Sequence, residues 1–213
     1  MLDTLAEKGD WGKPMPAGKG RGLAIHESYD SIVGMIAEVA VSPKSELKVE
    51  RVVIAADCGH TVNPRTVAMQ LEGGMIYGLS AVLFSEITIR NGSVEQGNFD
   101  TYPVVRLKDA PKTEVHLALT GGAKWGGVGE PGAAIIPAAV TNAIFAAIGK
   151  RIRSLPIKNQ NLSGAAKRSE AIPGSWLADL QSQRRHCERS EAIQEQRDGL
   201  LRRLRLLAMT TRE

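Results

Sequence analysis

The residues of this sequence that could do chemistry are concentrated in one glycine-rich stretch, Gly121 to Gly132, which reads GGAKWGGVGEPG. Six of its twelve residues are glycine, and Glu130 is its only acid. Glycine lets the backbone adopt positive φ and lay its N–H groups against a bulky ligand. Pro131 restricts Glu130 to extended geometry and so fixes where its carboxylate points. We therefore predict that Glu130 is a catalytic base in a loop that faces a ligand.

Cysteine and histidine lie close together at one other place in the chain. Cys58 and His60 follow an apolar stretch, and a metal-binding pair is one interpretation. The nearest other histidines, His26 and His116, lack the spacing of a ligand set. We therefore favour a structural role for Cys58 and His60 and predict no metal ligand.

Three polar or aromatic side chains flank these positions. Asp57 and Asn63 are expected to cap and shape a turn between a strand and a helix rather than to bind a ligand. Trp125 lies inside the glycine loop. It either lines a substrate pocket or packs against its neighbours.

The elements that position these residues begin after a loop-like opening. Val33 to Val41 and Leu47 to Ala55 are rich in β-branched residues and are separated by a polar turn, which predicts a hairpin. The second strand carries Asp57 to His60 at its end. An α-helix is expected next, from Arg65 to Phe84.

Apolar residues recur along that helix at helical spacing, and the expected inward positions are Met69, Ile76, Leu79, Val82 and Leu83. Gly73, Gly74 and Gly78 interrupt it, at a cost of roughly 1 kcal/mol each relative to alanine. Close packing of the helix backbone against another element would explain them.

Two short strands are expected before the glycine loop. Glu86 to Arg90 precedes Asn91-Gly92, which is a strong hairpin signal. Asn98 to Pro111 looks like an irregular connection. Thr113 to Leu119 is a strand that runs into the loop.

Beyond the loop, Pro137 to Ile148 is expected to be a buried helix with proline in its first turn and Gly149 as its C-terminal cap. Ile152 to Ile157 is expected to be a closing strand. Strands and helices thus mix without a regular βαβ alternation, which predicts an α+β fold of mixed sheets and packed helices.

Composition bounds the class of protein. The 213 residues contain no uninterrupted run of roughly 18 apolar residues, so we expect a soluble protein without a membrane span. Two cysteines in dissimilar regions favour a reducing compartment, and the polar N-terminus is no targeting peptide. We expect a cytoplasmic protein, or a periplasmic one if an export signal lies on a missing N-terminus.

The net charge of +4 comes mostly from the C-terminal tail. From Asn161 onward there are ten Lys/Arg against seven Asp/Glu, and before it seventeen against sixteen. No basic stripe interleaved with aromatic residues occurs in the first part, which argues against nucleic acid as a partner.

The tail also differs in pattern. Arg-Ser-Glu-Ala-Ile occurs at 168–172 and again at 189–193, and a basic leucine-rich run follows. It is either an amphipathic helix for a membrane surface or a partner, or a poorly structured appendage similar to translated intergenic repeats. We predict a domain over residues 1–158 and an appended tail over 159–213.

Six ordered blocks carry a family resemblance over about Trp11 to Ile157: GRGLA from Gly20, AADCGHTVNP from Ala55, QLEGG from Gln70, NFDTYPVVR from Asn98, GGVGEPG from Gly126 and NAIFAAIGKRIRSLP from Asn142. In these blocks the chain resembles the C-terminal part of the large molybdopterin-binding subunit of the xanthine dehydrogenase and aldehyde oxidase superfamily, nearest to the isoquinoline 1-oxidoreductase type.

The resemblance implies an oxidoreductase that hydroxylates an aldehyde or an electron-poor heterocycle with oxygen from water and passes two electrons to iron–sulfur clusters. Its cofactor would be a molybdopterin, in the cytosine dinucleotide form. In the family the glutamate of this motif takes a proton from the metal-bound hydroxyl, and Glu130 occupies that position. The resemblance also assigns cofactor contacts to Gln70, Gly127, Val128 and Gly129.

Because family subunits are several-fold longer, the resemblance implies that this chain does not turn over alone. Its expected partners are the missing N-terminal part of the large subunit, a small subunit with a [2Fe–2S] cluster, and a small-molecule substrate. Two alternatives stay open, which are an inactive truncated gene product and a non-enzymatic interaction module that uses the basic tail.

Overall fold

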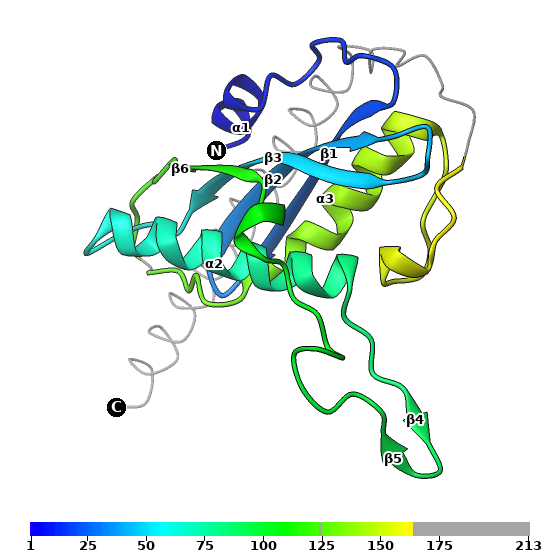
Figure 1. The fold of residues 1–213 in the computed structure, drawn as a ribbon. Coiled ribbons are helices and arrows are strands. Elements are labelled where there is room, and N and C mark those ends of the chain that lie inside the picture. Colours follow the sequence, from blue (N-terminus) through cyan, green and yellow to red (C-terminus); the bar gives the residue numbers. More distant parts are fainter. Residues whose placement is uncertain (124, 164–213) are drawn as a thin grey trace, which may run out of the picture. The chain divides into compact units, whose positions relative to one another are not determined.

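The computed structural model describes residues 1–123 and 125–163, and the statements below concern this part of the chain. Its centre is a four-stranded sheet with the order β1-β2-β3-β6 (Figure 1). The strands are β1 (Lys19–Ser28), β2 (Ser31–Val41), β3 (Leu47–Asp57) and β6 (Lys112–Leu117). The helices are α1 (Leu2–Lys8), α2 (Pro64–Leu83) and α3 (Pro131–Ile148). This mixture confirms the predicted α+β class.

Alternating side chains give the sheet two covered faces. In β2, Val33 and Met35 belong to the core shared with α2 and α3, whereas Ile36 packs with Leu5 of α1. β1 and β2 are antiparallel, as are β2 and β3, and β6 lies parallel to β3. The predicted hairpin of the second and third strands and the predicted strand before the glycine loop are therefore confirmed.

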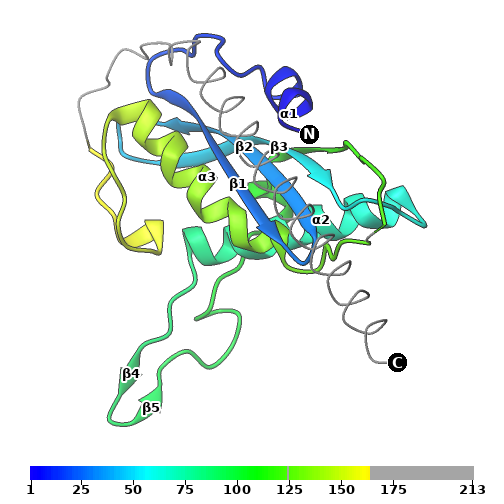
Figure 2. The ribbon, with the colours of Figure 1, turned by 180° about the vertical axis from the view of Figure 1, so that it is seen from behind.

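The expectation of a loop-like opening is wrong, because α1 and β1 both precede the predicted strands. β1 contains two glycines, which weakened its strand pattern in the sequence. They are needed because α3 lies directly on this strand (Figure 2). A Cβ on Gly22 would stand 2.2 Å from the carbonyl oxygen of Ala139, and one on Gly20 would stand 2.4 Å from that of Ala143.

The predicted helix after β3 is confirmed as α2. Asn63 is its N-cap and accepts a hydrogen bond from the backbone N–H of Thr66 (3.2 Å), as expected. Leu79 and Val82 are buried, but the prediction for Met69 is wrong, since its side chain is 62% exposed. Val67 packs against the core, and Leu71 is the first buried residue of the helix.

The prediction for the next helix is wrong at its start, because α3 begins at Pro131, six residues before Pro137. Pro131 occupies the first turn, and Pro137 lies inside the helix. Gly149 has φ 71° and ends the helix as predicted, donating its N–H to Phe145 O (2.8 Å).

By length and composition alone, α3 could cross a membrane, and among the described residues it is the one helix that could. However, 56% of it is buried within the fold. It packs on β1 and α2, as the central helix of a folded domain does.

An arm leaves the domain between α2 and β6 and carries the small hairpin of β4 (Ile89–Arg90) and β5 (Ser93–Val94) (Figure 1). The predicted turn, Asn91-Gly92, joins the two strands with positive φ at both residues. A short 3-10 helix, η1 (Leu107–Asp109), follows within the predicted irregular connection.

The predicted closing strand at Ile152 to Ile157 is wrong, since this stretch forms no strand and leads into a second 3-10 helix, η2 (Ile157–Asn159). Ile157 is buried in the main core, so its apolar character reflects packing rather than strand pairing. The proposed tail lies almost entirely outside the described residues, and the division at residue 158 stays a prediction.

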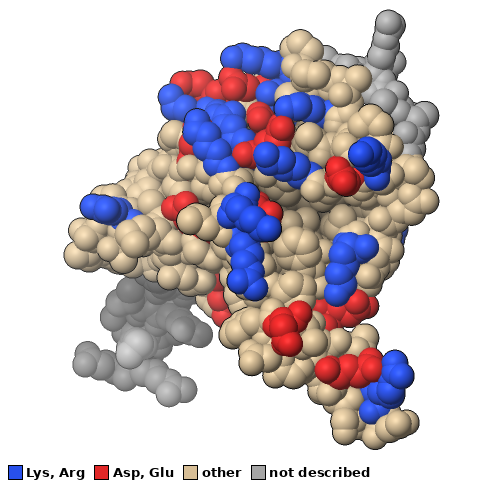
Figure 3. Space-filling model, in the orientation of Figure 1, with Lys and Arg blue, Asp and Glu red and all other residues tan. Residues whose placement is uncertain are grey.

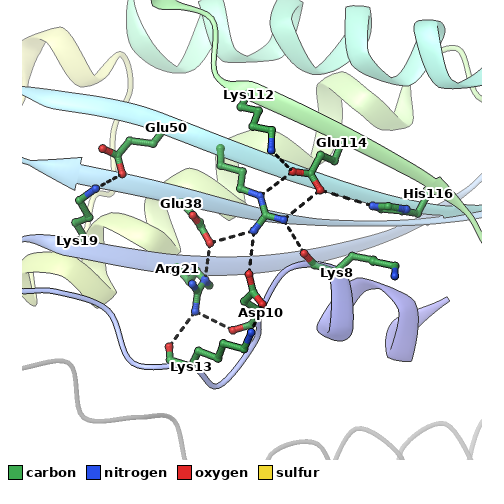
Figure 4. A network of polar contacts seen from close by, with 11 residues as sticks. Lys8, Asp10, Lys13, Lys19, Arg21, Glu38, Glu50, Lys112, Glu114 and His116 are labelled. Carbon is green, nitrogen blue, oxygen red and sulfur yellow. Dashed lines mark hydrogen bonds and ion pairs between the residues drawn. The ribbon is translucent and has the colours of Figure 1, made fainter.

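Ion pairs cover the part of the sheet next to α1 (Figure 4). Arg51 is the centre of this group, and it bonds Glu114 through Nε and Nη2, at 3.1 Å each. Its Nη1 lies 3.5 Å from Glu38 Oε1, and Arg21 Nε donates to the same oxygen at 2.7 Å. Positive and negative side chains alternate on this part of the surface (Figure 3). Ion pairs between side chains of opposite charge therefore link all four strands of the sheet.

Candidate functional site

Two turns at one end of the sheet hold the glycine-rich loop. The N–H of Gly127 donates to Tyr29 O (2.8 Å) in the turn between β1 and β2. The N–H of Gly126 donates to Cys58 O (2.9 Å), just beyond the end of β3. Gly121 N–H donates to Gly59 O (3.2 Å). The loop is thus fixed by its own backbone to the sheet beneath it.

Glycine is required at position 126 for contact rather than for a special φ. A Cβ there would stand 2.1 Å from Ser31 Oγ and 2.7 Å from Asp30 O. A Cβ on Gly129, by contrast, would have no atom within 4 Å. One glycine therefore lets the loop approach the hairpin turn, and the other leaves open space on the pocket side.

Asp57 organises the end of β3. Its Oδ1 accepts from the N–H groups of Gly59 (3.0 Å) and Thr120 (3.2 Å), and its Oδ2 accepts from Thr120 Oγ1 (2.6 Å). Partial burial raises the pKa of this carboxyl, but the hydrogen bonds outweigh burial and the pKa is lowered. Asp57 thus shapes this turn, as predicted, and joins it to the residue before the glycine loop.

Cys58 and His60 both contact the loop region. Cys58 is a buried free thiol 3.5 Å from His60 O, and burial raises the pKa of the thiol. His60 Nε2 lies 2.6 Å from Gly122 O, and its ring is 5.1 Å from that of Trp125. The described residues contain no group of three His, Cys, Asp or Glu able to hold a metal ion.

Glu130 stands at the N-cap of α3, and its side chain is exposed. The expectation of an extended backbone at Glu130 is wrong, since its φ and ψ are −110° and −27°. The physical reason is that α3 begins at the following residue, and the N–H groups of Ala133 and Ala134 donate to Glu130 O. Proline at the first helical position tolerates this geometry.

The carboxylate of Glu130 is not used to cap its own helix. Its Oε2 instead accepts a hydrogen bond from the hydroxyl of Tyr29 (3.1 Å). This bond to the carboxylate, together with its negative charge, raises the pKa of the Tyr29 phenol, since ionised tyrosine would repel it.

A pocket of about 650 Å³ lies between α2 and the start of α3. It is lined by Gln70, Gly73, Gly74, Tyr77, Gly129, Glu130, Ala133 and Ala134. Gln70 Nε2 donates to Gly129 O (3.1 Å), which joins the two walls. Three of the predicted site residues, Gln70, Gly129 and Glu130, are therefore brought to one pocket.

The other predicted positions lie beside this pocket rather than in its lining. Gly127 rests on Tyr29, and Val128 packs its side chain against the main core. Trp125 is 62% exposed next to His60, and it does not line the pocket either.

Tyr29 is the contact that the sequence-based prediction missed. It forms, with Asp30, a two-residue turn in which both residues have positive φ, the pattern of a type I′ hairpin. The missed strand β1 concealed this turn, because a hairpin signal needs a strand on both sides. Recognising GRGLAIHES as a strand would have revealed it.

Comparison with known proteins identifies the class of protein to which this fold and pocket belong. Residues 3–111 match the family model described as the molybdopterin cofactor-binding domain. This match includes Tyr29 and Gln70 and ends before the glycine loop. The chain therefore belongs to the molybdopterin-binding xanthine dehydrogenase and aldehyde oxidase family.

Among individual relatives, the isoquinoline 1-oxidoreductase subunit beta of Brevundimonas diminuta is 35% identical over 74% of this chain. A membrane-bound aldehyde dehydrogenase (pyrroloquinoline-quinone) of Gluconacetobacter polyoxogenes is 34% identical, also over 74%. This chain spans 21% of the length of each. Quinoline 2-oxidoreductase from Pseudomonas putida 86 shares the fold, with a TM-score of 0.54 and 24% identity over 60% of this chain and 17% of that one.

Proposed function

We propose that this chain is the part of a molybdenum hydroxylase large subunit that supplies the catalytic base, Glu130. The reaction would be the oxidative hydroxylation of an aldehyde or an N-heteroaromatic compound, with water as the oxygen source. The observation that carries this proposal is that Glu130, Gln70 and Gly129 share one pocket in a chain of this family.

The pocket, of about 650 Å³, has room for a large cofactor. Its wall at Gly73 and Gly129 has open space where any other residue would place a Cβ. Gln70 and Gly129 line the pocket and would contact the group, and the backbone of Gly127 and Val128, beside the pocket, would support that wall. When bound, a molybdopterin, which we propose to be the cytosine dinucleotide form, would supply a metal that acidifies water and accepts two electrons.

Glu130 itself would take a proton. The hydroxyl of Tyr29 donates to Oε2, and Oε1 would accept the proton. The fixed loop backbone would keep this oxygen at one place relative to Gln70. The electrons would leave through [2Fe–2S] clusters on a small partner subunit.

This function would also draw on the rest of a large subunit, because the chain spans about a fifth of the relatives' length. We propose that the remaining part of the large subunit and an iron–sulfur subunit are these partners. A reducing compartment, inferred from the cysteines, makes the cytoplasm the proposed location.

The test is co-expression of the full 213-residue chain with polypeptides that supply the rest of a large subunit and an iron–sulfur subunit. Molybdenum and pterin content and aldehyde oxidation are measured. We expect Glu130→Gln to keep both contents and to lower kcat by about 10²-fold or more. Glu72→Gln is the matched control, because Glu72 is exposed and outside the pocket lining.

Two results would contradict the proposal in different ways. Absence of molybdenum from every complex would favour an inactive gene product. Equal kcat for wild type and Glu130→Gln in a loaded complex would remove Glu130 from the role of base.

A further inference from the structure

We propose that Tyr29 is a positioning residue that holds the Glu130 carboxylate at the pocket through its hydroxyl. The catalytic consequence of this inference rests on the proposed function, but the contact itself does not. Tyr29 belongs to a hairpin turn that is 101 residues away in sequence. No motif of the glycine loop points to it.

Among the described residues, Tyr29 is the side chain that hydrogen-bonds the Glu130 carboxylate. As the N-cap of α3, Glu130 makes no side-chain cap hydrogen bond, and it is exposed. A glutamate side chain loses considerable rotamer freedom when it is held in one conformation. The hydroxyl of Tyr29, 3.1 Å from Oε2, is the donor that offsets this loss.

Tyr29 also holds the glycine loop at two points. Its carbonyl oxygen accepts from Gly127 N–H at 2.8 Å, three residues before the glutamate that its hydroxyl contacts. Gly127 also lies directly against the tyrosine, since a Cβ there would be 3.1 Å from Tyr29 Cβ. Tyr29 therefore holds both the loop backbone and the Glu130 carboxylate by hydrogen bonds.

The hairpin turn that carries Tyr29 is a rigid support. The two-residue turn closes the register of β1 and β2 at Ser28 and Ser31. Tyrosine has only two side-chain torsions before its hydroxyl, so the position of the turn largely fixes the position of the hydroxyl. The sheet therefore determines where the carboxylate of Glu130 lies.

The contact is tested first in the full 213-residue chain, without cofactor or partner. The phenols of the tyrosines are followed by NMR in ¹³C-tyrosine-labelled protein during a pH titration. We expect the Tyr29 pKa to fall when Glu130→Gln removes the negative charge. The Tyr102 signal is the internal reference, because Tyr102 lies in the arm. An unchanged Tyr29 pKa would overturn the inference.

The positioning role is tested with Tyr29→Phe, which keeps the ring and the backbone acceptor for Gly127. We expect ¹³C relaxation to show a less ordered Glu130 side chain, with unchanged hydrogen exchange of the Gly127 amide. In the assembled enzyme, kcat should fall about tenfold with KM unchanged. Tyr102→Phe should change none of these quantities.

The outcomes separate this inference from the proposed function. An equally ordered Glu130 in Tyr29→Phe and wild type would overturn the positioning role even if Glu130→Gln abolished turnover. Conversely, a loaded complex that is insensitive to Glu130→Gln would reject the base, while the titration in the isolated chain would still report the contact.

Discussion

At the scale of single residues, the carboxylate of Glu130 is placed by a neighbour rather than by its own helix. Short polar side chains at a helix N-cap satisfy the exposed N–H groups of the first turn, and the Glu130 side chain makes no such bond. Glu130 uses its backbone carbonyl for Ala133 and Ala134 and turns its side chain to Tyr29. Its carboxylate therefore stays available at the pocket.

Gly126 is the residue whose replacement should most directly disturb this placement. In Gly126→Ala the new methyl group would lie 2.1 Å from Ser31 Oγ and 2.7 Å from Asp30 O, so the loop must move away from the turn. We expect a loss of about 1–3 kcal/mol in the free energy of unfolding, measured by urea denaturation.

Gly129→Ala is the matched control for Gly126→Ala, because its methyl group would meet nothing within 4 Å. Its free energy of unfolding should stay within about 0.5 kcal/mol of wild type. Equal losses in the two variants would show that the loop is not held against the hairpin turn.

Part of the site could be predicted from these residues. Glycine density and a single acid were enough to single out Glu130 as a candidate, and the structure places it in a pocket lining. The backbone conformation of Glu130 could not be predicted, because it depends on α3 beginning at Pro131 rather than at Pro137. Tyr29 could not be predicted without the pairing of β1 and β2.

At the scale of elements, α2 and α3 approach each other through glycine. A Cβ on Gly78 would stand 2.5 Å from Ala133 O and 2.9 Å from Ala133 Cα. A Cβ on Gly132 of α3 would likewise stand 2.6 Å from Leu71 O of α2. This contact sets the width of the pocket, because Ala133 lines it.

Alanine substitutions in α2 should therefore have opposite effects at two positions. We expect Gly78→Ala to destabilise the fold by about 1–3 kcal/mol, since the helices must separate. Gly73 has nothing within 4 Å, so Gly73→Ala should stabilise it by about 0.5–1 kcal/mol through helix propensity. Thermal unfolding of both variants provides the measurement, and a stable Gly78→Ala would contradict the packing described.

The helical pattern predicted the location of α2 better than it predicted which face of the helix points inward. The spacing of its apolar residues located the helix, yet it placed Met69 inward because the pattern weighs hydrophobicity alone. The glycines correctly indicated close packing at Gly78, whereas Gly73 lies open at the pocket. Which glycine meets a neighbour depends on the position of α3, which is a tertiary property.

At the scale of the whole described domain, we expect Glu114 to make the free energy of unfolding depend on pH. Hydrogen bonds from Arg51 and Lys112 lower the pKa of this carboxyl to about 2, from an ordinary 4.5. Because the folded pKa is below the unfolded one, the carboxylate stabilises the fold above pH 4.5. This contribution is lost as the pH falls from 4.5 toward 2.

Urea denaturation of wild type and Glu114→Gln from pH 7 to pH 2.5 measures this contribution. We expect a difference on the order of 1–2 kcal/mol at neutral pH that shrinks in acid, since the group is partly exposed to solvent. Glu72→Gln, on an exposed position, should show no such pH dependence. A difference for Glu114→Gln that stays constant with pH would exclude the ion pairs as its cause.

The hairpin turn under the glycine loop also has a consequence for the order of folding. Tyr29, the end of β3 and Gln70 all precede Glu130 in the chain, and Tyr29 does so by 101 residues. During synthesis, the surfaces that receive the loop emerge before the loop itself. Contacts of such long sequence separation form late in folding, because they close a large chain loop. The pocket should therefore be the last part of the domain to acquire its native geometry.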